Sequence, residues 1–213
     1  MELWKKIMNK FEWIFFDLDG TLVDNLQNLY SVYLNFLKKH HIQGNSKEFD
    51  TLNGPNVSEI VNILSKKYQL AENVDELETY YEKLISEEFL LLVPKKGVVD
   101  LLQNLQQNSY KLALVTSNSK KNIHHFLNKY NLYQIFDSIT FGDEVKNAKP
   151  SPDIYELCIK KNKLLKNQIL VIEDSDNGIQ SAKNTGLEYK KLEKDFQFEN
   201  FKEVLREIES KRI

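Results

Sequence analysis

Cysteine, glycine and proline are scarce in this sequence, and each scarcity excludes a class of protein. The 213 residues include one cysteine, seven glycines and four prolines. A single cysteine, Cys158, excludes an intrachain disulfide framework, and so few glycines and prolines argue against a low-complexity linker. No apolar run approaches the roughly 20 residues that span a bilayer, and the first residues lack the apolar stretch of a secretory signal. We therefore expect a cytoplasmic protein that does not bind membranes.

An excess of charge of one sign is also missing. The chain has 29 lysines and arginines against 31 aspartates and glutamates, which gives a formal net charge of −2. Binding to nucleic acid generally needs a basic face, so we expect no nucleic-acid partner. Apolar residues make up 41% of the chain, which is enough for a core of ordinary size. The sequence gives no indication of the oligomeric state.

Four short apolar runs are typical of buried strands, and a polar turn follows each of them. The runs are Trp13–Phe16, Leu112–Val115, Ile139–Phe141 and Ile169–Ile172. Helical periodicity follows most of these runs. This alternation predicts an α/β fold, with a Rossmann-like parallel sheet and helices on both of its faces. A weaker fifth strand is expected around Leu187–Leu192.

Residues 25–94 follow a different pattern. Apolar side chains recur there at helical spacing, and no strand-like run interrupts them. Short segments that are polar or contain glycine and proline open and close this stretch, as hinges would. We therefore predict two domains, a Rossmann-like catalytic core formed by residues 1–24 and 95–213, and an inserted α-helical cap domain formed by residues 25–94.

Two carboxylates follow the first predicted strand. Asp17 and Asp19 are separated by one residue, and Gly20 allows the backbone to turn sharply after them. Alternate residues of an extended chain point the same way, so both side chains can face one site. Such a pair suits metal binding, nucleophilic attack or general acid/base catalysis. Taken alone, the pattern fits a solvated Asp-Gly turn equally well.

Polar groups also lie after the other predicted strands. The segment Thr116–Asn118 follows the second strand, and its hydroxyls and the start of the next helix could bind phosphoryl oxygens. Lys149 lies beside prolines that restrict the backbone, and Glu173–Asp174 follow the fourth strand. Each feature alone is more often a helix cap, a surface lysine or a solvated acidic loop.

The combination of these features is more informative than any one of them. Parallel strands end at one edge of the sheet, where ligands bind near a topological switch point. Four carboxylates would share that crevice with one lysine, and two like charges at about 4 Å repel by roughly 4 kcal/mol at an effective dielectric constant of 20. Such a cluster needs protons or a cation. Because all the donors are oxygens, Mg²⁺ with a phosphate co-ligand suits the site best.

In their order and spacing, these residues resemble the four motifs of the haloacid dehalogenase superfamily of phosphohydrolases. Asp17, Asp19 and Thr21 resemble the first motif, and the helical stretch resembles the superfamily's cap. The likeness is to the subgroup of phosphoglycolate phosphatases and β-phosphoglucomutase-like proteins. It implies a Mg²⁺-dependent phosphatase that hydrolyses a small-molecule phosphate monoester through an aspartyl-phosphate intermediate.

The resemblance also implies a role for each residue. Asp17 would be the nucleophile and Asp19 the general acid and base, while Thr116 and Lys149 would hold phosphoryl oxygens. The implied Mg²⁺ ligands are Asp17, Asp19 through its backbone carbonyl, Glu173 and Asp174. The expected contacts to the substrate are Gly20, Thr21, Ser117, Asn118, Asn53 and Asn56.

Two alternatives stay open at the level of the sequence. A β-phosphoglucomutase-like phosphosugar mutase would share every motif residue, but those enzymes carry a cap histidine where this chain has Leu29. Their cap loop also carries basic residues, which this chain lacks. The second alternative is a catalytically lapsed homologue that serves as a binding scaffold. The presence of both Asp17 and Asp19 argues against it.

Overall fold

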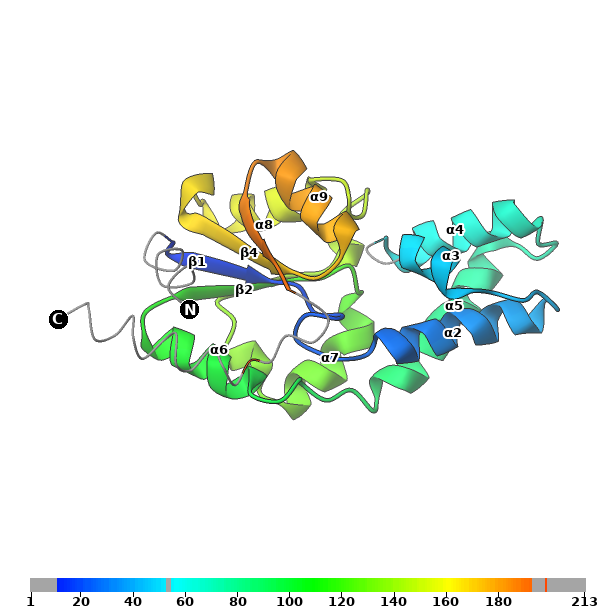
Figure 1. The fold of residues 1–213 in the computed structure, drawn as a ribbon, viewed down its shortest axis with the longest axis horizontal. Helices are drawn as coiled ribbons and strands as arrows, with labels where there is room; N and C mark the ends of the chain where they lie inside the picture. Colours follow the sequence, from blue (N-terminus) through cyan, green and yellow to red (C-terminus); the bar gives the residue numbers. More distant parts are fainter. Residues whose placement is uncertain (1–10, 53–54, 193–197, 199–213) are drawn as a thin grey trace.

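A five-stranded parallel sheet lies at the centre of the computed structural model, which describes residues 11–52, 55–192 and 198 (Figure 1). The spatial order of its strands is β3-β2-β1-β4-β5, and each neighbouring pair is parallel. The α/β fold and the five strands predicted from the sequence are confirmed. The strands are β1 (Trp13–Phe16), β2 (Lys111–Val115), β3 (Ser138–Thr140), β4 (Ile169–Glu173) and β5 (Glu188–Lys191).

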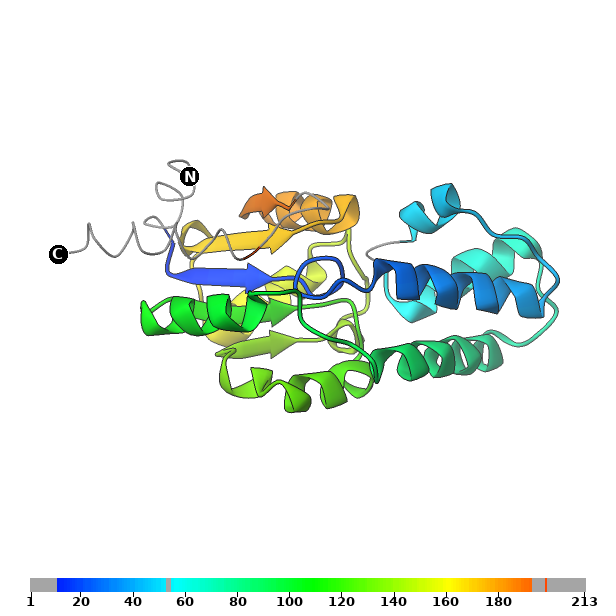
Figure 2. The same ribbon diagram turned by 60° about the horizontal axis from the view of Figure 1, so that its bottom comes forward.

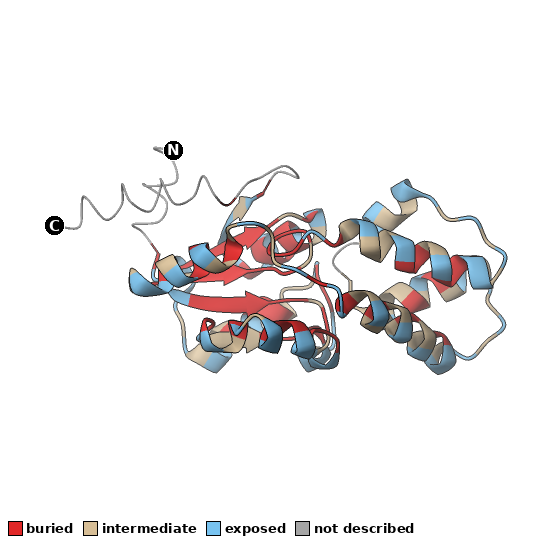
Figure 3. Ribbon diagram, turned by 90° about the horizontal axis from the view of Figure 1, so that it is seen from below, coloured by how far each residue is buried: buried red, intermediate tan, exposed pale blue. Residues whose placement is uncertain are grey.

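The central strands are apolar apart from Lys111 at the start of β2 and Glu173 at the end of β4, because both faces of the sheet are covered. Side chains of β1 alternate between the two faces, so that Ile14 and Phe16 enter one hydrophobic cluster and Phe15 enters the other. The residues of β2 and β4 divide between the clusters in the same way. Figure 3 shows the buried residues concentrated along these strands.

In the described part of the chain, α6 (Val98–Gln107) and α7 (Lys120–Lys129) pack on one face of the sheet and α8 (Asp153–Asn162) and α9 (Asp176–Thr185) pack on the other, and Figures 1 and 2 show these two layers. Helices α6 and α7 contribute to the first cluster, and α8 and α9 contribute to the second. Short 3-10 turns complete this part of the chain, and they are η1 (Leu132–Gln134), η2 (Gly142–Glu144) and η3 (Lys166–Gln168). No helix of the described residues is both long and apolar enough to cross a bilayer.

The described residues between β1 and α6 form four further helices, which we call the cap. They lie beyond the carboxyl ends of the strands (Figures 1 and 2). An asparagine caps the start of the second, third and fourth cap helices, because its side-chain oxygen accepts a hydrogen bond from a backbone N–H of the first turn. The domain boundaries at 24/25 and 94/95 stay a prediction. The cap helices are α2 (Leu26–Lys39), α3 (Ser46–Thr51), α4 (Val57–Tyr68) and α5 (Val74–Phe89).

We expect the substitution Phe15→Ala to lower the free energy of unfolding by about 3–5 kcal/mol, because it opens a cavity in a close-packed interior. The ring is fully buried and lies parallel to the ring of Tyr155, with 6.4 Å between centroids. Urea titration measures the loss. The matched control is Leu165→Ala, where the side chain is 63% exposed and we expect a change within about 0.5 kcal/mol. Similar losses for both variants would contradict this account of the core.

Candidate active site

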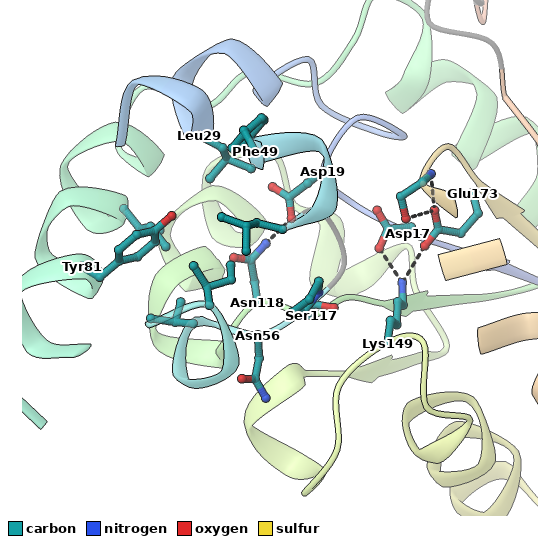
Figure 4. A pocket seen from close by; sticks show the side chains of 16 residues that line it. Asp17, Asp19, Leu29, Phe49, Asn56, Tyr81, Ser117, Asn118, Lys149 and Glu173 are labelled. Carbon is teal, nitrogen blue, oxygen red and sulfur yellow. Dashed lines mark hydrogen bonds and ion pairs between the residues drawn. The ribbon is translucent and has the colours of Figure 1, made fainter. Parts of the chain in front are cut away.

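One buried lysine connects three strands at the carboxyl edge of the sheet. The ammonium nitrogen of Lys149 lies 2.7 Å from Oδ1 of Asp17 and 2.9 Å from Oε1 of Glu173 (Figure 4). It also donates to the carbonyl oxygen of Val115, at 3.1 Å. The lysine is 1% exposed. Burial alone would lower its pKa, but the two carboxylates hold the pKa well above the ordinary lysine value.

The register of the sheet brings Asp17 and Glu173 together. Phe16 of β1 pairs with Ile172 of β4, so the residues that follow leave the sheet side by side. The backbone N–H of Asp17 donates to the carbonyl of Ile172 at 3.1 Å. The second oxygen of Glu173 accepts bonds from the backbone N–H and hydroxyl of Ser175, at 2.8 and 3.0 Å. Glu173 is therefore fixed by the loop between β4 and α9.

Asp174 is held by the turn that follows β1. The hydroxyl of Thr21 donates to Oδ1 of Asp174 at 2.9 Å. Gly20 has a φ of +79°, and a Cβ atom there would come within 2.2 Å of Oδ2 of Asp174. Only glycine fits a left-handed backbone at that distance. Thr21 is fully buried, and its hydroxyl has a carboxylate as its partner. The expected contact of Thr21 with the substrate stays a prediction.

Asp19 has different partners from the other three acids. The side-chain amides of Asn25 and Asn118 each donate to one oxygen of its carboxylate. Burial raises the pKa of Asp19, and the two amide hydrogen bonds oppose that rise. The backbone N–H of Asn118 in turn donates to the hydroxyl oxygen of Thr116 at 3.1 Å. The end of β2 therefore orients the carboxylate that follows β1.

Asn25 was not among the residues predicted from the sequence. It directly precedes α2, where an asparagine usually caps the helix, but its side chain makes no capping bond. Its amide turns back to Asp19 instead, at 2.5 Å. The only signal in the sequence was an asparagine at the start of the cap, and an asparagine there fits an ordinary helix cap equally well.

Three carboxylates form a group that could hold a metal ion. Oxygens of Asp17, Glu173 and Asp174 lie within 4.8 Å of one another. Burial raises the pKa of Asp174 to about 7, and repulsion from Glu173 adds to the shift. Burial also raises the pKa of Asp17, although Lys149 opposes it. A cluster of oxygen donors with too little positive charge suits a hard divalent cation such as Mg²⁺. The donor set therefore fits the metal implied by the resemblance.

A pocket lies between this cluster and the cap. Asp17, Asp19, Lys149 and Glu173 line one side, and cap residues such as Leu29, Phe49 and Tyr81 lie opposite (Figure 4). The lining also includes Ser117 and Asn118, both predicted from the sequence.

The two predicted cap contacts have different outcomes. Asn56 lines the pocket, but its side-chain oxygen accepts the backbone N–H of Glu59 at 2.9 Å and so caps α4. Its role in substrate binding stays a prediction. Asn53 lies outside the described residues.

The sequence matches the family model described as haloacid dehalogenase-like hydrolase over residues 14–192. The chain belongs to this family. It is similar to a phosphorylated carbohydrates phosphatase of Thermotoga maritima, with 29% identity over 83% of this chain and 82% of that protein. It is also similar to the pyrophosphatase PpaX of Halalkalibacterium halodurans, with 27% identity over 82% of this chain and 80% of the relative.

Solved structures confirm the fold. A variant of CbbY from Rhodobacter sphaeroides in complex with xylulose-1,5-bisphosphate superposes with a TM-score of 0.74 at 22% identity, covering 88% of this chain and 90% of that one. At this identity the likeness concerns the fold alone. The predictions of the family, the α/β fold and a hydrolytic enzyme are confirmed, and the predicted phosphatase agrees with the similar proteins named above.

We expect Lys149→Met to lower the free energy of unfolding by about 3–5 kcal/mol, because two buried carboxylates lose their counter-ion. The matched control is Lys161→Met. Lys161 pairs with Glu144 at 2.6 Å, and both side chains are about a third exposed, so we expect a loss of no more than about 1 kcal/mol. Chemical denaturation in metal-free buffer at neutral pH compares the two. Equal losses would show that the buried ion pairs of Lys149 stabilise the fold no more than the partly exposed pair of Lys161.

Proposed function

We propose that this hydrolase removes the phosphoryl group from a small-molecule phosphate monoester, with Asp17 as the nucleophile. The observation that supports this most directly is the position of Asp17. Lys149 holds its Oδ1 atom, and no described residue donates a hydrogen bond to Oδ2. The side chain lines the pocket beside Asp19. One oxygen is thus oriented while the other is available to attack phosphorus.

The proposed reaction has two steps. In the first, Asp17 attacks phosphorus and Asp19 donates a proton to the leaving oxygen, which gives an aspartyl-phosphate and an alcohol. In the second, Asp19 takes a proton from a water that attacks phosphorus, the bond between phosphorus and the Asp17 oxygen breaks, and inorganic phosphate and the free Asp17 carboxylate are formed. The amides of Asn25 and Asn118 fix the Asp19 carboxylate between the two steps.

Thr116 and Lys149 bind the phosphoryl group in this proposal. The Thr116 oxygen accepts hydrogen bonds from Asn118, which leaves its own proton free to donate to a phosphoryl oxygen. Lys149 supplies positive charge at the nucleophile. Mg²⁺ would be held by Asp17, Glu173, Asp174 and the backbone carbonyl of Asp19, and it would neutralise charge on the transferred group.

The structure offers no support for the mutase alternative. Leu29, which occupies the position of the mutases' cap histidine, lines the pocket with an apolar side chain. No group at that position can exchange a proton with a sugar hydroxyl. Phosphatase activity in the test below would also exclude a lapsed scaffold. The cytoplasmic location and the absence of a nucleic-acid partner stay predictions.

We expect Asp17→Asn to abolish release of phosphate from a generic aryl phosphate in the presence of Mg²⁺, because an amide cannot form the acyl phosphate. Asp19→Asn should lower kcat by about 10²–10⁴-fold, the usual contribution of a general acid or base. A colorimetric phosphate assay measures both. The control is Asp143→Asn, on an exposed 3-10 turn outside the pocket. Unchanged turnover in Asp17→Asn would disprove the assignment of the nucleophile.

Mg²⁺ should stabilise the folded chain. At a concentration about 100 times Kd, binding to the native state alone adds about 2.7 kcal/mol, which corresponds to about 5–10 °C in Tm for a chain of this size. Asp174→Asn should reduce the shift, because it removes one ligand. The control Asp176→Asn alters a side chain that is 92% exposed and should retain it. Calorimetry in the presence of a chelator and with added Mg²⁺ measures the shift in Tm. An identical Tm for the unaltered chain under the two conditions would contradict the metal site.

A further inference from the structure

We infer that the substrate of this enzyme is the phosphate ester of an uncharged, largely apolar alcohol. This inference rests on the proposed phosphatase function, because it concerns the part of the substrate that leaves. The observation behind it is the chemistry of the cap wall of the pocket. That wall faces the reacting groups and must surround whatever is attached to the phosphoryl group.

The cap wall is built almost entirely from hydrocarbon. All four cap helices contribute to it, and each presents aliphatic or aromatic side chains toward the pocket. These side chains come from Leu29, Phe49, Val57, Ile60, Tyr81 and Ile85. A wall of this kind stabilises a bound ligand through the apolar surface that it removes from water, at about 25 cal/mol per Å².

A second anionic group on the substrate would find no counter-ion here. Among the described residues that line the pocket, Lys149 is the only cation, and Asp17 and Glu173 already accept from it. Residues 53 and 54 are asparagine and glycine, so they add no charge. An anion buried without a partner is strongly disfavoured, and the nearby carboxylates would repel it further.

The charged residue next to Ile60 on α4 is acidic and already has a hydrogen-bond partner. Glu59 precedes Ile60 on α4, and its Oε1 atom accepts the backbone N–H of Ala148 at 2.8 Å. It therefore joins the cap to the loop that carries Lys149.

Two side chains of the cap wall can offer polar groups to a ligand. Tyr81 is 3% exposed, and its hydroxyl points into the pocket in Figure 4. No described residue forms a hydrogen bond with it. Asn56 also lines the pocket, and its oxygen is occupied in capping α4 while its amide N–H groups have no described acceptor. The wall thus offers a ligand the Tyr81 hydroxyl and the Asn56 amide, which are too few to satisfy the many hydroxyls of a sugar.

The first test compares three esters of primary alcohols, whose intrinsic reactivities are similar. They are benzyl phosphate, whose alcohol part is apolar, glucose 6-phosphate, whose alcohol part is uncharged but polar, and 2-phosphoglycolate, whose alcohol part carries a carboxylate. We expect kcat/KM for benzyl phosphate to exceed that for 2-phosphoglycolate by at least about 100-fold, because burial of the second anion without a partner is strongly disfavoured. Glucose 6-phosphate should also be a poorer substrate than benzyl phosphate.

The second test places a cation in the wall. Ile60→Lys should raise the ratio of kcat/KM for 2-phosphoglycolate to that for benzyl phosphate by about tenfold or more, because the added ammonium pairs with the carboxylate. The matched control is Ile63→Lys on the same helix. Ile63 is 44% exposed and does not line this pocket, so the ratio should stay at the value of the unaltered enzyme.

The outcomes separate the two levels of the proposal. Hydrolysis of 2-phosphoglycolate or glucose 6-phosphate as efficiently as benzyl phosphate would overturn the inferred substrate class and leave the phosphatase intact. No release of phosphate from these three esters or from an aryl phosphate would overturn the proposed function itself. If Ile60→Lys does not fold, as judged by its circular dichroism, the comparison of the three esters with the unaltered enzyme still decides the question.

Discussion

The arrangement of the site depends on the ion pairs of Lys149 with Asp17 and Glu173. An ammonium group buried to this extent is stable only beside negative charge, and two carboxylates at this distance are stable only beside positive charge. The lysine also donates to the carbonyl at the end of β2. It therefore fixes the positions of three strand ends relative to one another. The nucleophile is held in place by the same contacts that keep the acidic cluster folded.

The cluster still has more negative than positive charge after this pairing. The raised pKa of Asp174 reflects burial and the proximity of Glu173. A protein can tolerate this excess of negative charge where a divalent cation binds together with the phosphate ester. Close packing of the acidic side chains against the backbone explains the glycines at this edge. Gly20 and Gly178 lie where a Cβ atom would collide with Asp174 or Glu173, so the backbone itself packs against the acids.

The pocket has two halves of opposite character. The sheet edge supplies charged groups and hydrogen bonds for the phosphoryl group, and the cap supplies hydrocarbon for the rest of the ligand. The contacts that connect the cap to the sheet edge include the bond of Glu59 to the Lys149 loop and the bond of Asn25 to Asp19. The orientation of the cap and the orientation of Asp19 are therefore linked. A cap that closes over a suitable ligand also excludes water from the reacting groups.

The sequence by itself determined the strands, their alternation with helices and the motif residues at the strand ends. It could do so because buried strands need continuous apolar runs and because parallel strands place their carboxyl ends at one edge. The helical insertion was also visible, since helical periodicity is a local property. Only the tertiary structure decided that Asn25 turns back to Asp19 and that Thr21 holds Asp174. It alone decided that Asn56 caps α4 and that the cap wall is apolar. These features depend on contacts between residues far apart in the chain or on the choice between competing local hydrogen bonds, and neither leaves a periodic pattern in the sequence.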